Sequence, residues 1–383
     1  VLAPFVAIIF KNPQVTSILR VMALGMPIGA LSGVHNAMVS KNMAFRKFFF
    51  SSISGSILSA IVGLTMVLLG CGVWSLVGQN LVSIMANTLV LIYIVRWFPK
   101  RKFSKERFKS LFSFGWKLTA SNLIGTFFSQ LKGYAIGLKY SPTDLAYYNR
   151  GEGVPGILFN NINSSINTVL FPVLSKLQDD KDAVRRALSR SMQMASFVLM
   201  PALLGLAAVS ENFVEILYTS KWAATIPFMQ VICVMNCFDL LGAANIQALK
   251  AVGRADTLLK LEVYKKPLML TILVGCMFIS PLAIAIGQLV YSLIALAINA
   301  YPNRKYVNYP LKDQFMDISR SLLTATSMAV VVYIIGKLPL NIYLLLGIQV
   351  VVGIILYVVL AKLFNNDSFV EVMQLVKSKF HKK

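Results

Sequence analysis

Charged residues are scarce in this sequence, and acidic residues are the scarcer of the two signs. Of 383 residues, 14% are charged, and 15 acidic side chains stand against 37 basic ones. A soluble domain carries roughly 25% charged residues, so this chain has too few to cover a water-facing surface. Because 57% of its residues are hydrophobic, the composition excludes an ordinary soluble protein and predicts an integral membrane protein.

Cysteine and histidine are also rare, with 4 and 2 residues respectively. Cys233 and Cys237 lie one helical turn apart in an apolar run, but neither a second cysteine pair nor a nearby histidine completes a metal site. His35 likewise has no neighbouring ligand. We therefore expect buried, inert thiols, and neither a bound metal nor a cofactor.

Two short motifs resemble nucleotide sites only superficially. Residues 151–156 fit G-x-G-x-x-G, but no strand precedes them and Pro155 lies inside the motif, so a dinucleotide site is excluded. Asp180 and Asp182 form a D-x-D pair in a short polar loop before an amphipathic segment, where an aspartate is expected to cap a helix.

Apolar segments of membrane-spanning length recur along the whole chain. A spanning helix needs about 20 residues, and eleven segments suit, near residues 15–39, 46–69, 73–96, 113–138, 144–175, 187–209, 222–249, 257–279, 281–301, 317–336 and 340–363. Residues 1–10 add part of a twelfth. Runs of this length in lipid are helices, so the sequence predicts an all-α polytopic membrane protein.

Basic residues are distributed unevenly among the connecting loops. One set of alternate loops, together with the C-terminus, holds 27 Lys and Arg residues, whereas the other set holds four. Basic loops stay on the cytoplasmic side, so we expect a cytoplasmic C-terminus. The net charge of +22 then indicates topology and contact with anionic lipids, not nucleic-acid binding.

A sparse internal repeat relates the two halves of the chain at an offset of 209 residues. It pairs Gly33, Asn36 and Lys41 with Gly242, Asn245 and Lys250. Six spans separate the copies, so both have the same orientation, as in transporters with parallel repeats. We predict two parallel six-helix lobes plus two C-terminal helices, with the start of the first lobe missing.

This repeat divides the chain into four parts. Residues 1–96 are the remainder of the N-lobe, and residues 97–112 are a cytoplasmic linker. Residues 113–301 are the C-lobe, and residues 302–383 are two extra helices and a basic cytoplasmic tail.

Polar residues inside the predicted spans are the candidate functional residues. The span 144–175 carries a polar stripe on one helical face, composed of Asn149, Gly153, Gly156, Asn160, Asn163 and Asn167. The span 113–138 places Lys117, Ser121 and Lys132 near one face, and no acid follows within that span to pair with Lys132. An ionisable residue in the membrane indicates a functional site, although Lys132 could instead extend its stem to the outer headgroups.

Further ionisable groups lie in neighbouring spans. Arg150 and Glu152 fall near the outer third of theirs. Glu262 precedes Lys265 and Lys266 by three and four residues, the favourable order for a helical ion pair. Interface anchoring and a cavity role both remain open for that group. Asp239 is the one acid deep in its span, where it either carries a coupling ion or makes a helix–helix hydrogen bond.

Several segments resemble bacterial polysaccharide flippases. These are FSFGWK (residues 112–117), YYNR (147–150), LFPVLS (170–175) and QDD (178–180), together with GVHNAMVSKNMAFRK (33–47) and GVWSLV (72–77). The resemblance covers nearly the whole chain and is to the O-antigen and exopolysaccharide exporters of the multidrug/oligosaccharidyl-lipid/polysaccharide superfamily, which have a MATE-like fold. Relatives often carry an acid where this chain has Lys132.

The resemblance implies a transporter and not an enzyme. Such proteins move an undecaprenyl-pyrophosphate-linked oligosaccharide across the bacterial inner membrane by alternating access, driven by an H⁺ or Na⁺ gradient. They serve O-antigen, capsule or exopolysaccharide synthesis, alongside a polysaccharide polymerase and chain-length machinery.

Site roles follow from this resemblance. Basic groups would hold the pyrophosphate and amides the glycan, which assigns substrate binding to Lys117, Ser121, Lys132, Arg150, Asn160, Asn163, Asn167, Lys265 and Lys266. Ion coupling is assigned to Glu152, Asp239 and Glu262. We expect Lys132, Arg150 and Asn160 to face one cavity. A multidrug exporter of the same superfamily and a membrane glycan polymerase are the alternatives, but the first favours acidic cavities and the second needs a sizeable outer loop.

Overall fold

The computed structural model describes residue 4, residues 13–41, 45–97 and 104–364, and residue 369. Every regular element in these residues is helical. The chain divides into two compact units, Val1–Thr126 and Phe127–Lys383, and the boundary falls within one long helix, α6 (Lys105–Lys139).

The first unit contains α2 (Gln14–Ala23), α3 (Gly25–Lys41), α4 (Phe45–Leu68), α5 (Trp74–Val95) and the first part of α6. Helices α4 and α5 run alongside each other, and α3 packs against α5. The sole described histidine of this unit, His35, is buried between the carbonyl oxygens of Leu31 and Trp97, 3.0 and 3.1 Å from its ring nitrogens. It therefore has structural partners and no ligand role.

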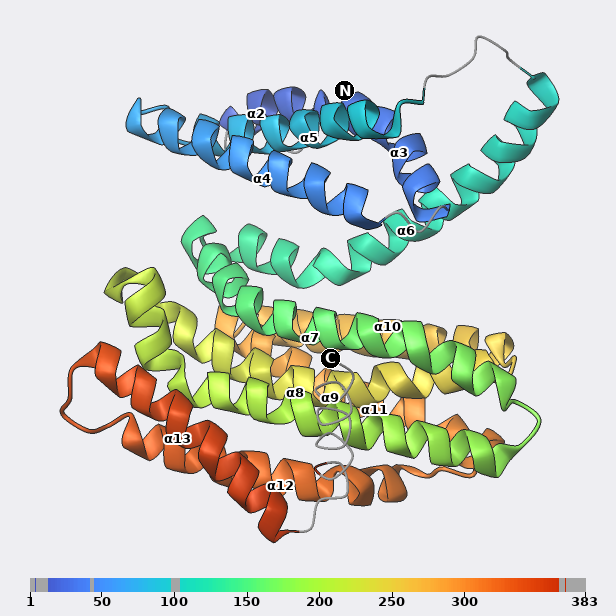
Figure 1. The fold of residues 1–383 in the computed structure, drawn as a ribbon, viewed down its shortest axis with the longest axis vertical. Helices are drawn as coiled ribbons and strands as arrows, with labels where there is room; N and C mark the ends of the chain where they lie inside the picture. Colours follow the sequence, from blue (N-terminus) through green and yellow to red (C-terminus); the bar gives the residue numbers. More distant parts are fainter. Residues whose placement is uncertain (1–3, 5–12, 42–44, 98–103, 365–368, 370–383) are drawn as a thin grey trace, which may run out of the picture. The chain divides into compact units, whose positions relative to one another are not determined.

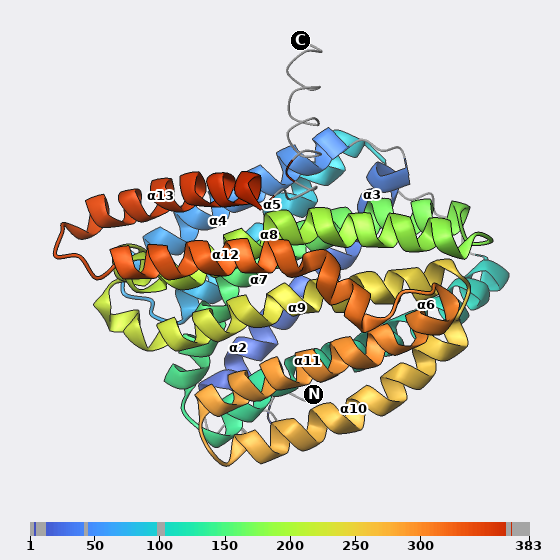
Figure 2. The same cartoon turned by 90° about the horizontal axis from the view of Figure 1, so that it is seen from below.

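The second unit contains the rest of α6 and a bundle of longer helices. These are α7 (Pro142–Lys176), α8 (Lys181–Tyr218), the short 3₁₀ helix η1 (Ser220–Thr225), α9 (Ile226–Ala251), α10 (Ala255–Met277), α11 (Pro281–Tyr306), α12 (Leu311–Ile335) and α13 (Ile342–Leu363). Helices α8 and α9 lie in the middle, with α7 on one side and α12 and α13 on the other (Figure 1). On the remaining side α9, α11 and α10 follow one another (Figure 2).

The main apolar core of this unit is built around α8 and α9, and α7, α11, α12 and α13 contribute further buried side chains. Leu188, Leu199 and Leu203 of α8 are fully buried, and so are Met229 and Cys233 of α9. Burying a large aliphatic side chain contributes roughly 1.5–3 kcal/mol. The free thiols of Cys233 and Cys237 are buried in this core, as expected.

Capping residues explain where α7 and α8 begin. Ser141 and Asp144 form a reciprocal capping box at the start of α7, where Pro142 occupies the first helical position. The Asp180 carboxylate accepts from the backbone N–H groups of Asp182 and Ala183, each at 3.0 Å. The expected capping role of the D-x-D pair is confirmed.

Eight helical stretches of the described residues are long and apolar enough to span a membrane. The segments expected at 113–138, 144–175 and 257–279 also form continuous helices, α6, α7 and α10, but their polar residues keep them outside that set. Several helices extend beyond the expected spans, α6 and α8 the furthest. Helix α6 begins at Lys105, inside the segment expected as a linker. Helix α8 runs on to Tyr218 because Ser210 and Val214 are buried against the bundle.

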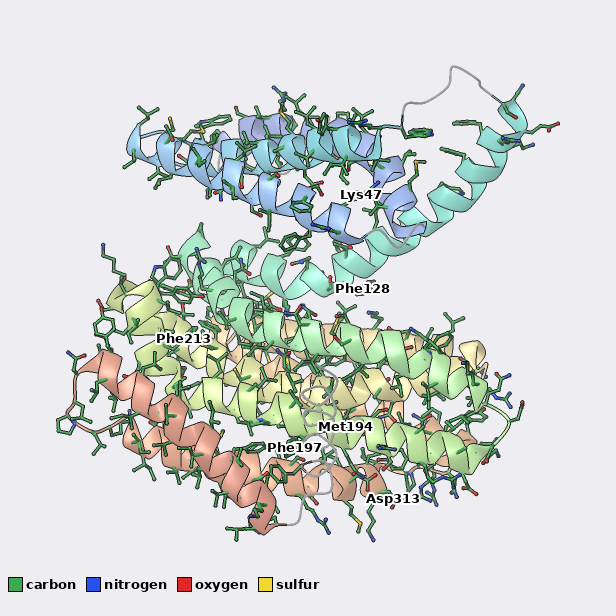
Figure 3. The ribbon with its side chains drawn as sticks, viewed as in Figure 1. Lys47, Phe128, Met194, Phe197, Phe213 and Asp313 are labelled. Carbon is green, nitrogen blue, oxygen red and sulfur yellow. The ribbon has the colours of Figure 1, made fainter. Side chains whose placement is uncertain are left out.

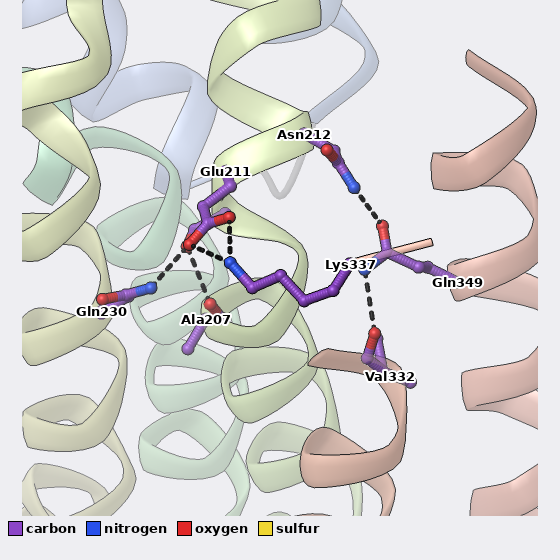
Figure 4. Close-up of polar contacts among 8 residues, drawn as sticks. Ala207, Glu211, Asn212, Gln230, Val332, Lys337 and Gln349 are labelled. Atoms are coloured by element: carbon purple, nitrogen blue, oxygen red, sulfur yellow. Dashed lines mark hydrogen bonds and ion pairs between the residues drawn. The ribbon is translucent and has the colours of Figure 1, made fainter. Parts of the chain in front are cut away.

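Polar contacts join α8, α12 and α13 where α12 ends (Figure 4). The Lys337 ammonium lies 2.8 Å from Glu211, and Asn212 donates to the side chain of Gln349. Gln349 in turn donates to the carbonyl of Val332 at 2.9 Å. These contacts fix α12 and α13 onto α8.

A buried amide cluster joins α9, α11 and α12 at the opposite end. Asn245 exchanges hydrogen bonds of 2.8 and 3.0 Å with Gln314, and accepts one of 2.7 Å from Asn303. All three side chains are fully buried. Asn245 is the residue that the internal repeat pairs with Asn36, and its structural role is to hold three helices together.

Candidate functional site

An ion pair between α6 and α7 lies inside the second unit. The Lys132 Nζ atom is 2.6 Å from the Glu152 Oε1 atom, and the two side chains are 19% and 37% exposed. The ammonium also lies 5.4 Å from the ring centre of buried Tyr148, within cation–π range. The Lys132 side chain therefore turns inward, and its positive charge is balanced by the Glu152 carboxylate on α7.

The helical repeat of α7 explains this arrangement. Tyr148 and Glu152 are one turn apart and share a face. Gly151, one position earlier, contacts α9 so closely that a Cβ atom there would lie 2.7 Å from the Phe228 Cβ atom. The glycine therefore lets α7 approach α9, and this approach fixes the rotation of α7 that turns Tyr148 and Glu152 inward.

A cavity of about 210 Å³ adjoins this ion pair. It lies among α6, α9, α10 and α11, and its polar lining comprises Ser129, Lys132, Asp239, Gln288, Tyr291 and Ser292. The Asp239 carboxylate accepts a hydrogen bond from the Ser292 hydroxyl. The structure thus brings together two residues predicted from sequence, one basic and one acidic.

The volume of this cavity limits what it can hold. Sites for drug-sized ligands span about 300–1,000 Å³, and a water occupies about 30 Å³. A space of about 210 Å³ is therefore large enough for an ion or a few waters but too small for an oligosaccharide. Its chemistry suits protons or small cations.

A second charged group lies on α10. Glu262 is bracketed by Lys265 Nζ at 2.6 Å and Lys266 Nζ at 3.5 Å, so the helical ion pair expected from the spacing is present. Lys266 also lies 5.1 Å from the ring centre of Phe128, which is labelled on α6 in Figure 3 and lines the cavity. The triad therefore adjoins the cavity without entering it.

Arg150 is not brought to Lys132. Its guanidinium carbon lies 5.6 Å from the ring centre of Tyr218 and 5.4 Å from that of Trp222, at the end of α8 and in η1. Because Arg150 is two positions from both Tyr148 and Glu152, it points to the opposite side of α7. Arg150 therefore does not line the cavity beside Lys132.

The asparagine stripe of α7 is also separate from this cavity. Asn160 is exposed and Asn163 is half-buried, and neither lines the cavity beside Lys132. No atom lies within 4 Å of a Cβ built on Gly153 or Gly156, so this face of α7 is open. The side chains of Lys117, Ser121 and Asn167 lie outside the described residues.

Sequence reasoning missed several members of the site. Tyr148, Gln288, Tyr291 and Ser292 each carry ordinary polar groups on predicted helices, and nothing in their local spacing connects them with Lys132. Tyr148, in the YYNR segment, could have been found from the sequence, because it lies four residues before Glu152 and so on the same face of a helix. The other three become visible only when α11 packs against α9.

A comparison with known protein families identifies the family of this chain. The family described as "Polysaccharide biosynthesis protein" matches residues 1–227 of the chain. The chain belongs to this family. That match bears out the resemblance seen in the sequence.

Curated relatives of the chain carry similar names. The chain is 24% identical over 300 residues to the lipopolysaccharide biosynthesis protein WzxC of Escherichia coli, covering 76% of this chain and 60% of WzxC. It is 26% identical over 258 residues to the succinoglycan biosynthesis transport protein ExoT of Rhizobium meliloti, covering 67% and 52%. The chain therefore spans between half and two thirds of the length of these relatives.

A solved structure has the same fold. The lipid II flippase MurJ, in its inward closed conformation, superposes with a TM-score of 0.74 at 16% identity, covering 92% of this chain and 75% of MurJ. This similarity shows the fold alone. The chain is therefore an all-α, multi-pass membrane protein.

Proposed function

We propose that the full-length protein is a flippase, a transporter and not an enzyme, that moves an undecaprenyl-pyrophosphate-linked oligosaccharide across the bacterial inner membrane by alternating access. The observation that carries this proposal is the family match over residues 1–227. Relatives named for lipopolysaccharide and succinoglycan synthesis support a polysaccharide precursor as the cargo. The fold shared with a lipid II flippase supports a lipid-linked one.

We further propose that energy coupling and glycan binding are carried out by different residues. The cavity beside Lys132 suits an ion, so we assign Lys132, Glu152 and Asp239 to energy coupling. The open asparagine face of α7, with Asn160 and Asn163, offers amide groups that suit a glycan. Charged pairs inside membrane proteins mark ion and proton pathways, which supports the first assignment. An H⁺ or Na⁺ gradient would supply the energy.

We also propose a membrane topology and partner proteins. The alternating basic loops support a cytoplasmic C-terminus. A flippase for a polysaccharide precursor would deliver its cargo to a polymerase and to chain-length machinery on the far side of the membrane.

Complementation tests the function and the coupling residues together. In a strain lacking the gene, the full-length parent should restore surface polysaccharide and abolish accumulation of the lipid-linked precursor. At equal protein level, Lys132→Ala should reduce export about tenfold, equivalent to about 1.4 kcal/mol. Lys139→Ala is the matched control, since Lys139 is an exposed lysine two turns further along α6.

Two outcomes would contradict the proposal. Normal export by the strain without the gene would remove the flippase function. Parental export by Lys132→Ala would remove the ion pair from the mechanism but leave the flippase function intact.

A further inference from the structure

A second, larger cleft lies where α10 begins and α11 ends. Helices α10 and α11 are antiparallel and joined by a short connection after Met277, so the first turns of α10 lie beside the last turns of α11. The cleft has a volume of about 520 Å³ and is lined by Thr257, Lys260 and Leu261 of α10 and by residues 301–306 of α11 except Asn303. It is separate from the cavity beside Lys132, with which it shares no lining residue.

The cleft is strongly basic. Lys260, Arg304 and Lys305 contribute three cations, and none of its lining residues is acidic. A fourth cation, Arg254, lies 4.7 Å from the ring centre of Tyr306. Among the described residues, Lys260 and Arg304 form no ion pair. Such a set of donors suits a phosphate group, which accepts charge-assisted hydrogen bonds from Arg and Lys.

The other walls of the cleft are apolar and aromatic. Leu261 and Pro302 in its lining are buried, while the Tyr301 side chain is 77% exposed. Tyrosines of this kind are enriched at headgroup level in membrane proteins. A soluble phosphate would gain nothing from the apolar wall and the aromatic rim, whereas a phospholipid would contact both.

We infer that this cleft binds the phosphate headgroup of an anionic membrane phospholipid. Its cations lie on the first turns of α10 and the last turns of α11, next to connections whose charge bias predicts the cytoplasmic side, where anionic lipids attract basic residues. The headgroup phosphate lies against Lys260, Arg304 and Lys305, and the upper acyl chains follow the apolar surface beside Tyr301. This site is independent of the transport function proposed above.

Equilibrium binding of fluorescent phosphatidylglycerol to the purified full-length protein in maltoside micelles tests this site. The triple variant Lys260→Gln, Arg304→Gln, Lys305→Gln should bind the lipid at least about tenfold more weakly than the parent, because it removes the charge-assisted contacts that the three cations make with the phosphate. A matched triple variant, Lys176→Gln, Lys181→Gln, Lys312→Gln, loses the same charge at exposed positions outside the cleft and should bind like the parent.

Further measurements distinguish the possible ligands and control for misfolded variants. Fluorescent phosphatidylcholine should bind weakly to all variants, and millimolar inorganic phosphate should fail to displace phosphatidylglycerol. The double variant Lys260→Arg, Lys305→Arg keeps the charge and should retain binding, and each variant should unfold at a temperature close to that of the parent. Equal losses in the two triple variants would overturn the site. Full displacement by inorganic phosphate would overturn its assignment to a lipid.

Discussion

A lysine ammonium within a membrane-spanning unit needs a compensating charge, and Glu152 provides it 2.6 Å from Lys132. Removing one member of such a pair leaves an uncompensated charge, whereas removing both leaves none. The partial exposure of both side chains admits some water and moderates the effect. Lys132 and Glu152 therefore act as a unit.

Thermal unfolding of the parent, the two single variants and the double variant measures the coupling between Lys132 and Glu152. Lys132→Met and Glu152→Gln should each lower stability by roughly 1–3 kcal/mol, and the double variant should lose less than the sum of the two. Lys139→Met, at an exposed position two turns further along the same helix, should change stability by less than about 0.5 kcal/mol. Additive losses would show that the two residues stabilise the protein separately.

At this scale the sequence identified charged residues but not their partners. Lys132 and Asp239 stand out because few ionisable groups occur in the apolar runs. The contact of Glu262 with Lys265 was predictable, since a helix brings residues three apart together. The pairing of Lys132 with Glu152, and the distance of Arg150 from both, depend on how α6, α7 and η1 pack, which local spacing does not encode.

Helix α7 shows how one glycine can position a whole element. A Cβ atom on Gly151 would lie 2.7 Å from the Phe228 Cβ atom and 3.0 Å from the Met229 backbone nitrogen. The backbone of α9 cannot give way as a flexible side chain would. Gly153, two positions further on, has open space around it. These two of the three glycines in the G-x-G-x-x-G segment therefore have different surroundings.

Alanine substitution should separate these two glycines. Gly151→Ala should destabilise the protein by roughly 1–3 kcal/mol, the cost of overpacking, and should impair transport by displacing Glu152. Gly153→Ala should be neutral or stabilising by up to about 1 kcal/mol, because alanine favours the helix. Thermal unfolding and export assays of both variants measure this difference, and equal behaviour would contradict the close approach of α7 to α9.

The helices themselves were largely predictable, because apolar runs of spanning length and caps such as Asp180 are local signals. Their ends were less so. Helix α8 continues to Tyr218 because Val214 is buried, and burial depends on tertiary contacts. The repeat pointed to Asn245, yet the cluster it forms with Asn303 and Gln314 joins residues 58 and 69 positions away.

For the whole molecule, composition was the strongest guide. The scarcity of charge and the length of the apolar runs predicted an all-α, multi-pass membrane protein, and both the described helices and the fold shared with MurJ confirm it. The division into two parallel lobes and the cytoplasmic C-terminus stay predictions. The basic loops give them physical support, since charge bias sets membrane orientation.

Reconstitution of the full-length protein into liposomes tests directly whether it moves a lipid-linked oligosaccharide across the membrane. Liposomes would carry a lipid-linked oligosaccharide, and the fraction of glycan reached by an external, membrane-impermeant glycosidase would be followed over time. With protein, that fraction should rise from about half toward the whole, faster than in protein-free liposomes and more slowly with Lys132→Ala than with Lys139→Ala. A rate equal to that of protein-free liposomes would contradict the assignment as a flippase.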